Sequence, residues 1–262
     1  MRFAHLVNPV AKGDEYELSW QQPITFESMR IAREFAKHEV ELTTTCYPED
    51  VKIIPDYFTQ LSLLERSTAG KFKIDRKLPF IGDIIEKFNE VDSDYCIYTN
   101  VDIGLYPYFY DFVGWVIDDG VDSMSITRIT KPCISKSVDD LPTIWGMGGS
   151  AHQGHDCFVF KRDILSSFDL CDLCVGMPWV GMGLLTNCSE LSKNFNIIQD
   201  ASVTFHIGDT REWRLIKYND YRFSNSKELV RMQNKFKLRS EIKEFGKENY
   251  SNECVEFTRR II

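Results

Sequence analysis

The chain has 262 residues, of which 43% are hydrophobic and 13% aromatic, so it can bury a sizeable core within one large domain. Its 39 acidic and 31 basic side chains give a net charge of -8, which argues against a dedicated nucleic-acid surface. No apolar run approaches the roughly 18 residues of a membrane-spanning helix, and the first residues lack the hydrophobic segment of a secretory signal. We therefore expect a cytoplasmic protein with no nucleic-acid partner.

The cysteines are scattered through the chain, which is typical of buried reduced thiols in a protein of this size. One C-x-x-C pair, Cys171 and Cys174, follows two histidines, His152 and His155, and raises the alternative of a structural zinc site. No second pair follows at a standard spacing. We therefore expect ordinary thiols and no zinc.

The first elements predict a βαβ unit. Residues 2–7 (RFAHLV) are typical of a strand, and this strand ends at Asn8, where nucleotide-binding α/β folds usually begin their site. Residues 20–37 place apolar side chains at helical spacing, with Thr25 as the expected N-cap. Residues 40–46 (VELTTTC) are rich in β-branched side chains and predict the second strand.

The central stretch of the chain is residues 95–99 (YCIYT), an apolar run that follows a predicted helix at residues 78–88. Such a run is typical of a strand that is covered on both faces of a sheet. It leads into the polar turn Asn100-Val101-Asp102. Ligands of open α/β sheets lie beyond the carboxyl ends of the strands, so Asp102 is expected to project into a cleft. The alternative is a purely local Asx turn.

The second half of the chain predicts alternating elements and one long irregular segment. In order, these are a helix at 106–116, a strand at 122–128, a glycine-rich loop at 131–154, a strand from about 155, a strand at 196–205 and helical structure from 221. Loops of this length are usually functional or disordered, and Trp145 within it needs a partner for its apolar ring. The last segment is amphipathic and basic, so peripheral contact with an anionic membrane is an alternative to packing on the main domain.

The stretch LPFIGDIIEKFNEVDSDYCIYTNVDIGLYPYFYDFV resembles the middle of GT-A type glycosyltransferases. In that family a helix leads into a strand ending in a D-x-D motif, which holds a divalent metal on a sugar nucleotide; here the motif reads N-V-D at residues 100–102. The resemblance implies an α/β fold with a Rossmann-like, mixed and mainly parallel sheet flanked by helices. It implies a GT-A domain at residues 1–220 and a C-terminal helical appendage at residues 221–262. The expected activity is transfer of a sugar from a nucleotide-diphosphate sugar to a glycan or glycoconjugate acceptor, as in polysaccharide biosynthesis.

The resemblance also implies a metal site and a donor site. Asp102 is the carboxylate that carries over as a metal ligand, and HIGDTREW looks like the element whose histidine, His206, completes the site. Mn²⁺ suits this mixed ligation, whereas Mg²⁺ prefers oxygen. Arginine can bind a diphosphate through two parallel hydrogen bonds. The expected donor-binding residues are Asn8, Arg66, Thr99, Asn100, Arg211 and Trp213.

Catalysis is expected to involve Asp156, as a general base on an acceptor hydroxyl or as an acceptor-binding group. Inverting relatives often hold the base in an acidic pair at the start of the following helix, and residues 175–185 (VGMPWVGMGLL) contain no carboxylate. A retaining enzyme, which needs no such base, stays open. Trp145, His155 and Trp179 are the expected acceptor contacts.

Two other functions remain open at this point. A sugar nucleotidyltransferase has a similar sheet, but it would normally show a glycine-rich loop after the first strand, and this loop has only Gly13. A non-catalytic nucleotide-sugar or glycan-binding protein is the second alternative. Asn100, in place of an aspartate, favours it.

Overall fold

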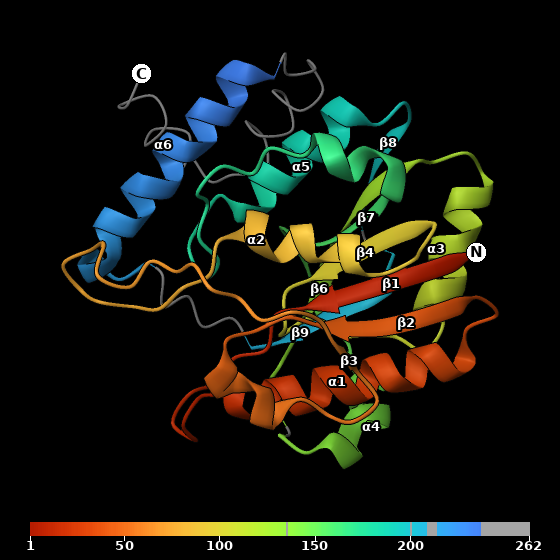
Figure 1. The fold of residues 1–262 in the computed structure, drawn as a ribbon. Coiled ribbons are helices and arrows are strands. Elements are labelled where there is room, and N and C mark those ends of the chain that lie inside the picture. The colour runs from red at the N-terminus through yellow and green to blue at the C-terminus, as the bar shows by residue number, and fades with distance from the viewer. Residues whose placement is uncertain (135, 200, 209–213, 237–262) are drawn as a thin grey trace.

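The computed structural model describes residues 1–134, 136–199, 201–208 and 214–236. Its sheet is flanked by helices on both faces (Figure 1). The strands are β1 (Arg2–Val7), β2 (Glu39–Thr44), β3 (Thr59–Gln60), β4 (Tyr95–Thr99), β5 (Gly104–Leu105), β6 (Ser123–Lys131), β7 (Ser150–Lys161), β8 (Phe195–Ile198) and β9 (Thr204–Ile207). The α-helices are α1 (Leu18–Phe35), α2 (Ile81–Glu86), α3 (Phe109–Asp118), α4 (Leu141–Gly146), α5 (Val180–Leu191) and α6 (Asn219–Lys235). Short 3₁₀ helices are η1 (Pro48–Ile53), η2 (Lys87–Glu90), η3 (Val138–Asp140), η4 (Arg162–Ser167) and η6 (Ile216–Tyr218).

The sheet is mixed and mainly parallel. The strand order is β3-β2-β1-β4-β7-β6-β9-β5, and β8 pairs with β6 ahead of β9. Strand β7 runs antiparallel to both of its neighbours, β4 and β6, so these two are parallel to each other. The carboxyl ends of β1, β2, β4, β6 and β9 therefore share one edge of the sheet with the amino end of β7. We call this the carboxyl edge.

Side chains alternate between two cores because both faces of the sheet are covered. On β1, Phe3 and Val7 pack with α1 and α3, whereas Ala4 and Leu6 pack with α2, α5 and α6. In Figure 1, α1 and α4 lie below the sheet, and α2, α5 and α6 lie above it. The predicted strands are continuously apolar because their side chains are buried on both faces of the sheet.

Three segments differ from the sequence predictions. Residues 131–154 are not one irregular loop, because Leu141 and Ile144 drive a short helix, α4, against α1, and β7 already begins at Ser150. The single late strand is two strands, β8 and β9, which pair with successive parts of β6. Thr25 is not an N-cap, since α1 starts at Leu18 and buries Thr25 in its interior.

Helix α6 is part of the packed structure. Leu229 and Met232 belong to the same core cluster as α2 and α5. Asn225 is fully buried and bonds the backbone of Cys174 and Pro178, just ahead of α5. Among the described residues, no helix is both long and apolar enough to cross a bilayer.

Candidate functional site

The pairing of β5 with β9 brings Asp102 to His206 at the carboxyl edge. Gly104 lies opposite Phe205 in this antiparallel pair, so the turn after β4 faces the end of β9. An added Cβ at Gly104 would meet the Phe205 ring at 2.2 Å, which explains the glycine. As a result, Asp102 Oδ2 and His206 Nε2 are 3.2 Å apart across 104 residues of chain. Both metal ligands predicted from the sequence are therefore side by side.

The ring of His206 presents Nε2 to this carboxylate in a defined way. Its Nδ1 lies 2.7 Å from the carbonyl oxygen of Gly208, which can only accept, so Nδ1 carries the proton of that bond. Nε2 then faces Asp102 either with a second proton or as a lone pair that a cation can share. Metal-binding histidines commonly donate their other ring N–H to a carbonyl in this way.

The charges around Asp102 favour its ionised form. Burial alone would raise its pKa, but the hydrogen bond and charge of His206, with the charge of Arg128, lower the pKa below its ordinary value. The Asp102 side chain keeps 28% of its surface exposed, so it is open to a ligand.

Asp102 and His206 fit a metal that is shared with a substrate. A carboxylate oxygen and an imidazole nitrogen are suitable ligands for Mn²⁺. Within the part of the chain that the structure describes, no group of three or more His, Cys, Asp or Glu side chains converges. Asp102 and His206 would supply two ligands, and phosphate oxygens and water can occupy further positions of the shell.

Asn100 and Asp156 are also brought together at this edge. Asn100 Nδ2 donates to Asp156 Oδ1 at 2.8 Å, and Asp156 Oδ2 forms an ion pair with Arg128. Both carboxylate oxygens thus have partners, which disfavours proton uptake by Asp156 from an acceptor. Sequence reasoning missed Arg128, because a single arginine inside a predicted strand carries no motif.

Asp50, in η1 after β2, is a second residue that the sequence did not single out, and it contacts the loop after β1. Asn8 Nδ2 donates to the carbonyl of Thr45, and Asp50 Oδ1 accepts the backbone N–H of Ala11 at 2.7 Å. Burial raises the pKa of Asp50 even though the Ala11 bond opposes it. Asp50 therefore shapes the loop beyond β1, at the same carboxyl edge. In the sequence, Asp50 is only an acidic residue after the second strand, and this feature is too common to indicate a functional role.

Thr99 points into the core. Its side chain is fully buried, and Oγ1 lies 3.0 Å from His5 Nε2. The backbone of Thr99 is buried as well, so contact with a nucleotide would require neighbouring groups to move.

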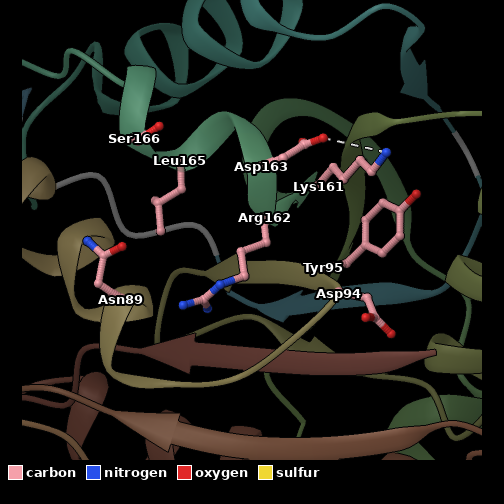
Figure 2. A pocket seen from close by; sticks show the side chains of 8 residues that line it. All are labelled: Asn89, Asp94, Tyr95, Lys161, Arg162, Asp163, Leu165 and Ser166. Carbon is pink, nitrogen blue, oxygen red and sulfur yellow. Dashed lines mark ion pairs between the residues drawn. The ribbon is translucent and has the colours of Figure 1, made fainter.

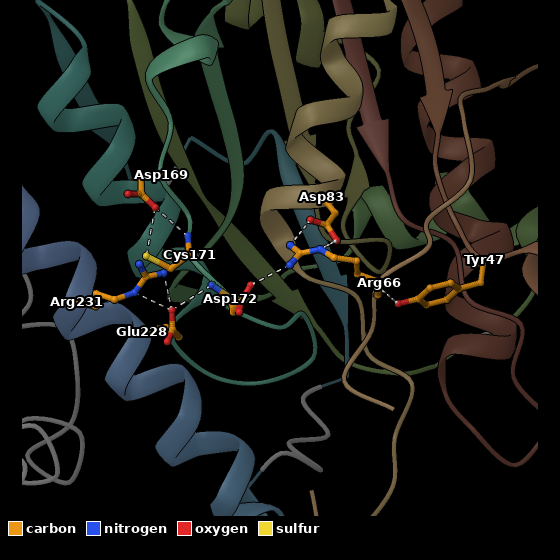
Figure 3. A network of polar contacts seen from close by, with 8 residues as sticks. All are labelled: Tyr47, Arg66, Asp83, Asp169, Cys171, Asp172, Glu228 and Arg231. Atoms are coloured by element: carbon orange, nitrogen blue, oxygen red, sulfur yellow. Dashed lines mark hydrogen bonds and ion pairs between the residues drawn. The ribbon is translucent and has the colours of Figure 1, made fainter. Parts of the chain in front are cut away.

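Arg66 lies in a surface network that joins distant segments (Figure 3). Its guanidinium donates two hydrogen bonds to Asp83 of α2 and reaches Asp172 at 3.3 Å. Glu228 of α6 accepts from the backbone of Asp172 and pairs with Arg231. Arg66 thus has carboxylate partners in the absence of any nucleotide.

The three expected acceptor contacts lie in different surroundings. Trp145, on α4, packs on the α1 side of the sheet and donates from Nε1 to Leu105 O at 2.9 Å. Trp179 packs on the α5 side, and its φ of 82° is rare for a large side chain and is often found at functional sites. His155 is 4% exposed, bonded to Ser125 Oγ, and burial lowers its pKa to about 4. Arg211 and Trp213 lie outside the described residues.

Two hollows lie at opposite edges of the sheet. One, of about 610 Å³, adjoins the site and is lined by Thr130, Lys131 and Gly208, among others. The other, of about 480 Å³, is at the amino end of β4 (Figure 2). Its charged groups have internal partners: Lys161 pairs with Asp163, and Arg162 donates to two backbone carbonyls. Of these two hollows, the first is connected to the site through Gly208, whose carbonyl is bonded to the ring of His206.

Comparisons with known proteins identify the fold. No protein-family model matches the sequence, and no curated protein matches it. Residues 1–349 of S. aureus TarS, solved in complex with UDP-GlcNAc, match with a TM-score of 0.56 and 11% identity, over 93% of this chain and 69% of that chain. The same protein in complex with UDP gives a TM-score of 0.54 and 10% identity, over 93% and 68%. At this identity the likeness shows the fold alone.

The fold class predicted from the sequence is confirmed. The mixed, mainly parallel sheet with helices on both faces matches GT-A glycosyltransferase structures.

Proposed function

We propose that this chain is a glycosyltransferase that moves a sugar from a nucleotide-diphosphate sugar to a hydroxyl of a glycan or glycoconjugate. The observation that carries the proposal is the convergence of Asp102 and His206, 3.2 Å apart, at the carboxyl edge of a GT-A sheet. Ligands of such sheets bind at this edge. The UDP-GlcNAc complex of a protein with the same fold supports a nucleotide-sugar donor.

In the proposed reaction, Asp102 and His206 would hold a divalent cation, Mn²⁺ or Mg²⁺. When bound, the cation would act as a Lewis acid that neutralises the charge of the diphosphate leaving group. In the absence of the cation, His206 and Arg128 lower the pKa of Asp102 against the effect of burial and so favour the ionised carboxylate that a cation needs. The donor is proposed to lie along the carboxyl edge, in contact with Asn8, Arg66, Thr99, Asn100, Arg211 and Trp213.

The acceptor is proposed to approach from the β7 side, where Trp179 and His155 lie. Trp145 is on the other side of the sheet and would contact only a long acceptor. Peripheral membrane contact through α6 also stays a prediction, and two of the basic side chains on this helix, Arg231 and Lys235, are already paired with acidic ones.

A non-catalytic nucleotide-sugar-binding protein is the alternative that one observation favours. Both oxygens of Asp156, the predicted base, already have partners in Asn100 and Arg128, which favours a role other than proton transfer. Release of UDP from UDP-GlcNAc, or of the nucleotide from another donor, separates the transferase from a binding protein. A nucleotidyltransferase would instead need a nucleoside triphosphate and a sugar 1-phosphate, and would release pyrophosphate as it forms the nucleotide sugar.

Thermal unfolding with a panel of nucleotide sugars, with and without Mn²⁺, tests the donor site. UDP and UDP-GlcNAc are the first probes. A nucleotide at a hundred times its Kd adds about 2.7 kcal/mol to the free energy of unfolding of a protein that binds it. We expect Asp102→Asn and His206→Ala each to remove the Mn²⁺-dependent part of this shift and to leave the unliganded fold intact. Asp163→Asn, in the distant hollow, is the matched control. An unchanged Mn²⁺ dependence in both variants would refute the metal site.

A further inference from the structure

Asp156 is the extra residue of a β-bulge. Ile126 of β6 pairs with Cys157, and the next residue, Thr127, pairs with His155, so Asp156 has no partner across the ladder. Bulges bend a strand and redirect a side chain, and they are frequent beside active sites. Here the redirected side chain reaches the end of β4.

The contacts of Asp156 determine how Asn100 is oriented. The carbonyl of Asp156 accepts the backbone N–H of Asn100 at 3.0 Å, and Oδ1 accepts from Nδ2 at 2.8 Å. Asn100 Oδ1 accepts from the hydroxyl of Tyr98 at 3.2 Å. The amide therefore has a donor side and an acceptor side that are both used. An aspartate at position 100 would place a second carboxylate against Asp156.

Arg128 balances the charge of Asp156. The two side chains are only 12% and 18% exposed, so neither charge is well solvated without the other. Removing one member of a pair this buried leaves an uncompensated charge. The same guanidinium also acts on Asp102, whose pKa it helps to lower.

We propose that Asp156, with Arg128 as its counter-ion, is a positioning residue that locks the Asn100–Asp102 turn and thereby aims Asp102 at His206. Asn100, which stands where the D-x-D pattern has its first aspartate, is the partner that Asp156 holds in place. This assignment rests on the proposed transferase site and replaces the role of Asp156 as general base.

An exchange of the two side chains tests the proposal. Four proteins are compared: the wild type, Asn100→Asp, Asp156→Asn, and the double variant, which restores one amide and one carboxylate at the same two positions. Asp163→Asn is again the control. The first measurement is the melting temperature without ligand, and the second is the further shift caused by UDP with Mn²⁺.

We expect each single exchange to lower the unliganded melting temperature by roughly 2–8 °C, because one places two carboxylates face to face and the other leaves Arg128 without its counter-ion. Each should also weaken the UDP–Mn²⁺ shift. The double variant should lose less of both quantities than the two single losses added together, because it removes the facing carboxylates and restores an amide–carboxylate hydrogen bond between positions 100 and 156. Asp163→Asn should match the wild type.

Two results would overturn the proposal. One is a double variant whose losses equal the sum of the single losses, since residues that act as a pair are not additive. The other is Asp156→Asn with an unchanged melting temperature and an unchanged UDP–Mn²⁺ shift but a loss of donor turnover, as a general base requires. Failure of the proposed function would be distinguishable, because the wild type itself would then show no shift in melting temperature with any nucleotide. The unliganded melting temperatures would still test the interaction between Asn100 and Asp156.

Discussion

At the residue scale, two buried histidines make the fold sensitive to acid. His5 is fully buried between Tyr110 and Thr99, and burial lowers its pKa to about 3. His155 is buried against Ser125, and burial lowers its pKa to about 4. Both rings are therefore neutral in the folded protein at pH values where an exposed histidine, with a pKa of about 6.5, takes up a proton.

This difference predicts a loss of stability as the pH falls below about 6.5. In that range the unfolded chain binds more protons than the folded one, so the free energy of unfolding falls with decreasing pH. Each histidine contributes at most about 1.4 kcal/mol per pH unit, down towards its folded pKa. Urea unfolding at pH 7.5, 6.5 and 5.5 measures the slope. We expect His5→Gln, which can keep both hydrogen bonds, to flatten it; a slope equal to that of the wild type would contradict the assignment.

At the element scale, the first turn of α5 lies directly on β7 beside the site. A Cβ at Gly181 would be 2.5 Å from the carbonyl oxygen of His155, and a backbone atom cannot move aside as a side-chain end can. Helix α5 is therefore held close to β7, and the strained Trp179 immediately precedes it.

We predict that Gly181→Ala destabilises the protein by about 1–3 kcal/mol, the usual cost of overpacking. Alanine is the better helix former by about 1 kcal/mol, so a loss of stability would isolate the contact with His155 as its cause. Gly146→Ala at the end of α4 is the control, because an added Cβ there meets nothing within 4 Å. Thermal unfolding of both variants gives the answer. Equal melting temperatures would show that α5 can shift without cost.

At the scale of the whole molecule, α6 is predicted to be indispensable to the domain at residues 1–220. Leu229 and Met232 fill the core beneath α5, and the burial of each such side chain is worth about 1.5–3 kcal/mol. Loss of Asn225 would also leave backbone groups of Cys174 and Pro178 unpaired. Total stabilities are only about 5–15 kcal/mol.

We therefore expect a fragment of residues 1–220 to lose cooperative unfolding, whereas a fragment of residues 1–236 keeps it. Circular dichroism during heating compares the two. If residues 1–220 alone melted cooperatively within a few degrees of residues 1–236, α6 would be an appendage that the main domain does not need.

Much of the fold could be read from local patterns. The ranges of β1 and β4 follow from continuous apolar runs, which reflect burial on both faces of the sheet. The helix between β1 and β2 follows from apolar side chains at helical spacing. The predicted bounds differ from the observed ones at α4, a short helix within a glycine-rich segment, and at β8 and β9, two strands that the sequence predicts as one. In both cases packing against a distant element decided the outcome.

The sequence alone determines that a carboxylate, Asp102, follows the end of a buried strand, because this position depends only on the strand and the turn after it. The partners of this turn come from the tertiary structure. His206 arrives through the register of β5 on β9, and Asp156 through a bulge that shifts β7 against β6. Contacts separated by 104 and 56 residues depend on strand register. A shift of one residue in that register would turn each side chain to the other face of the sheet, and no local pattern records it.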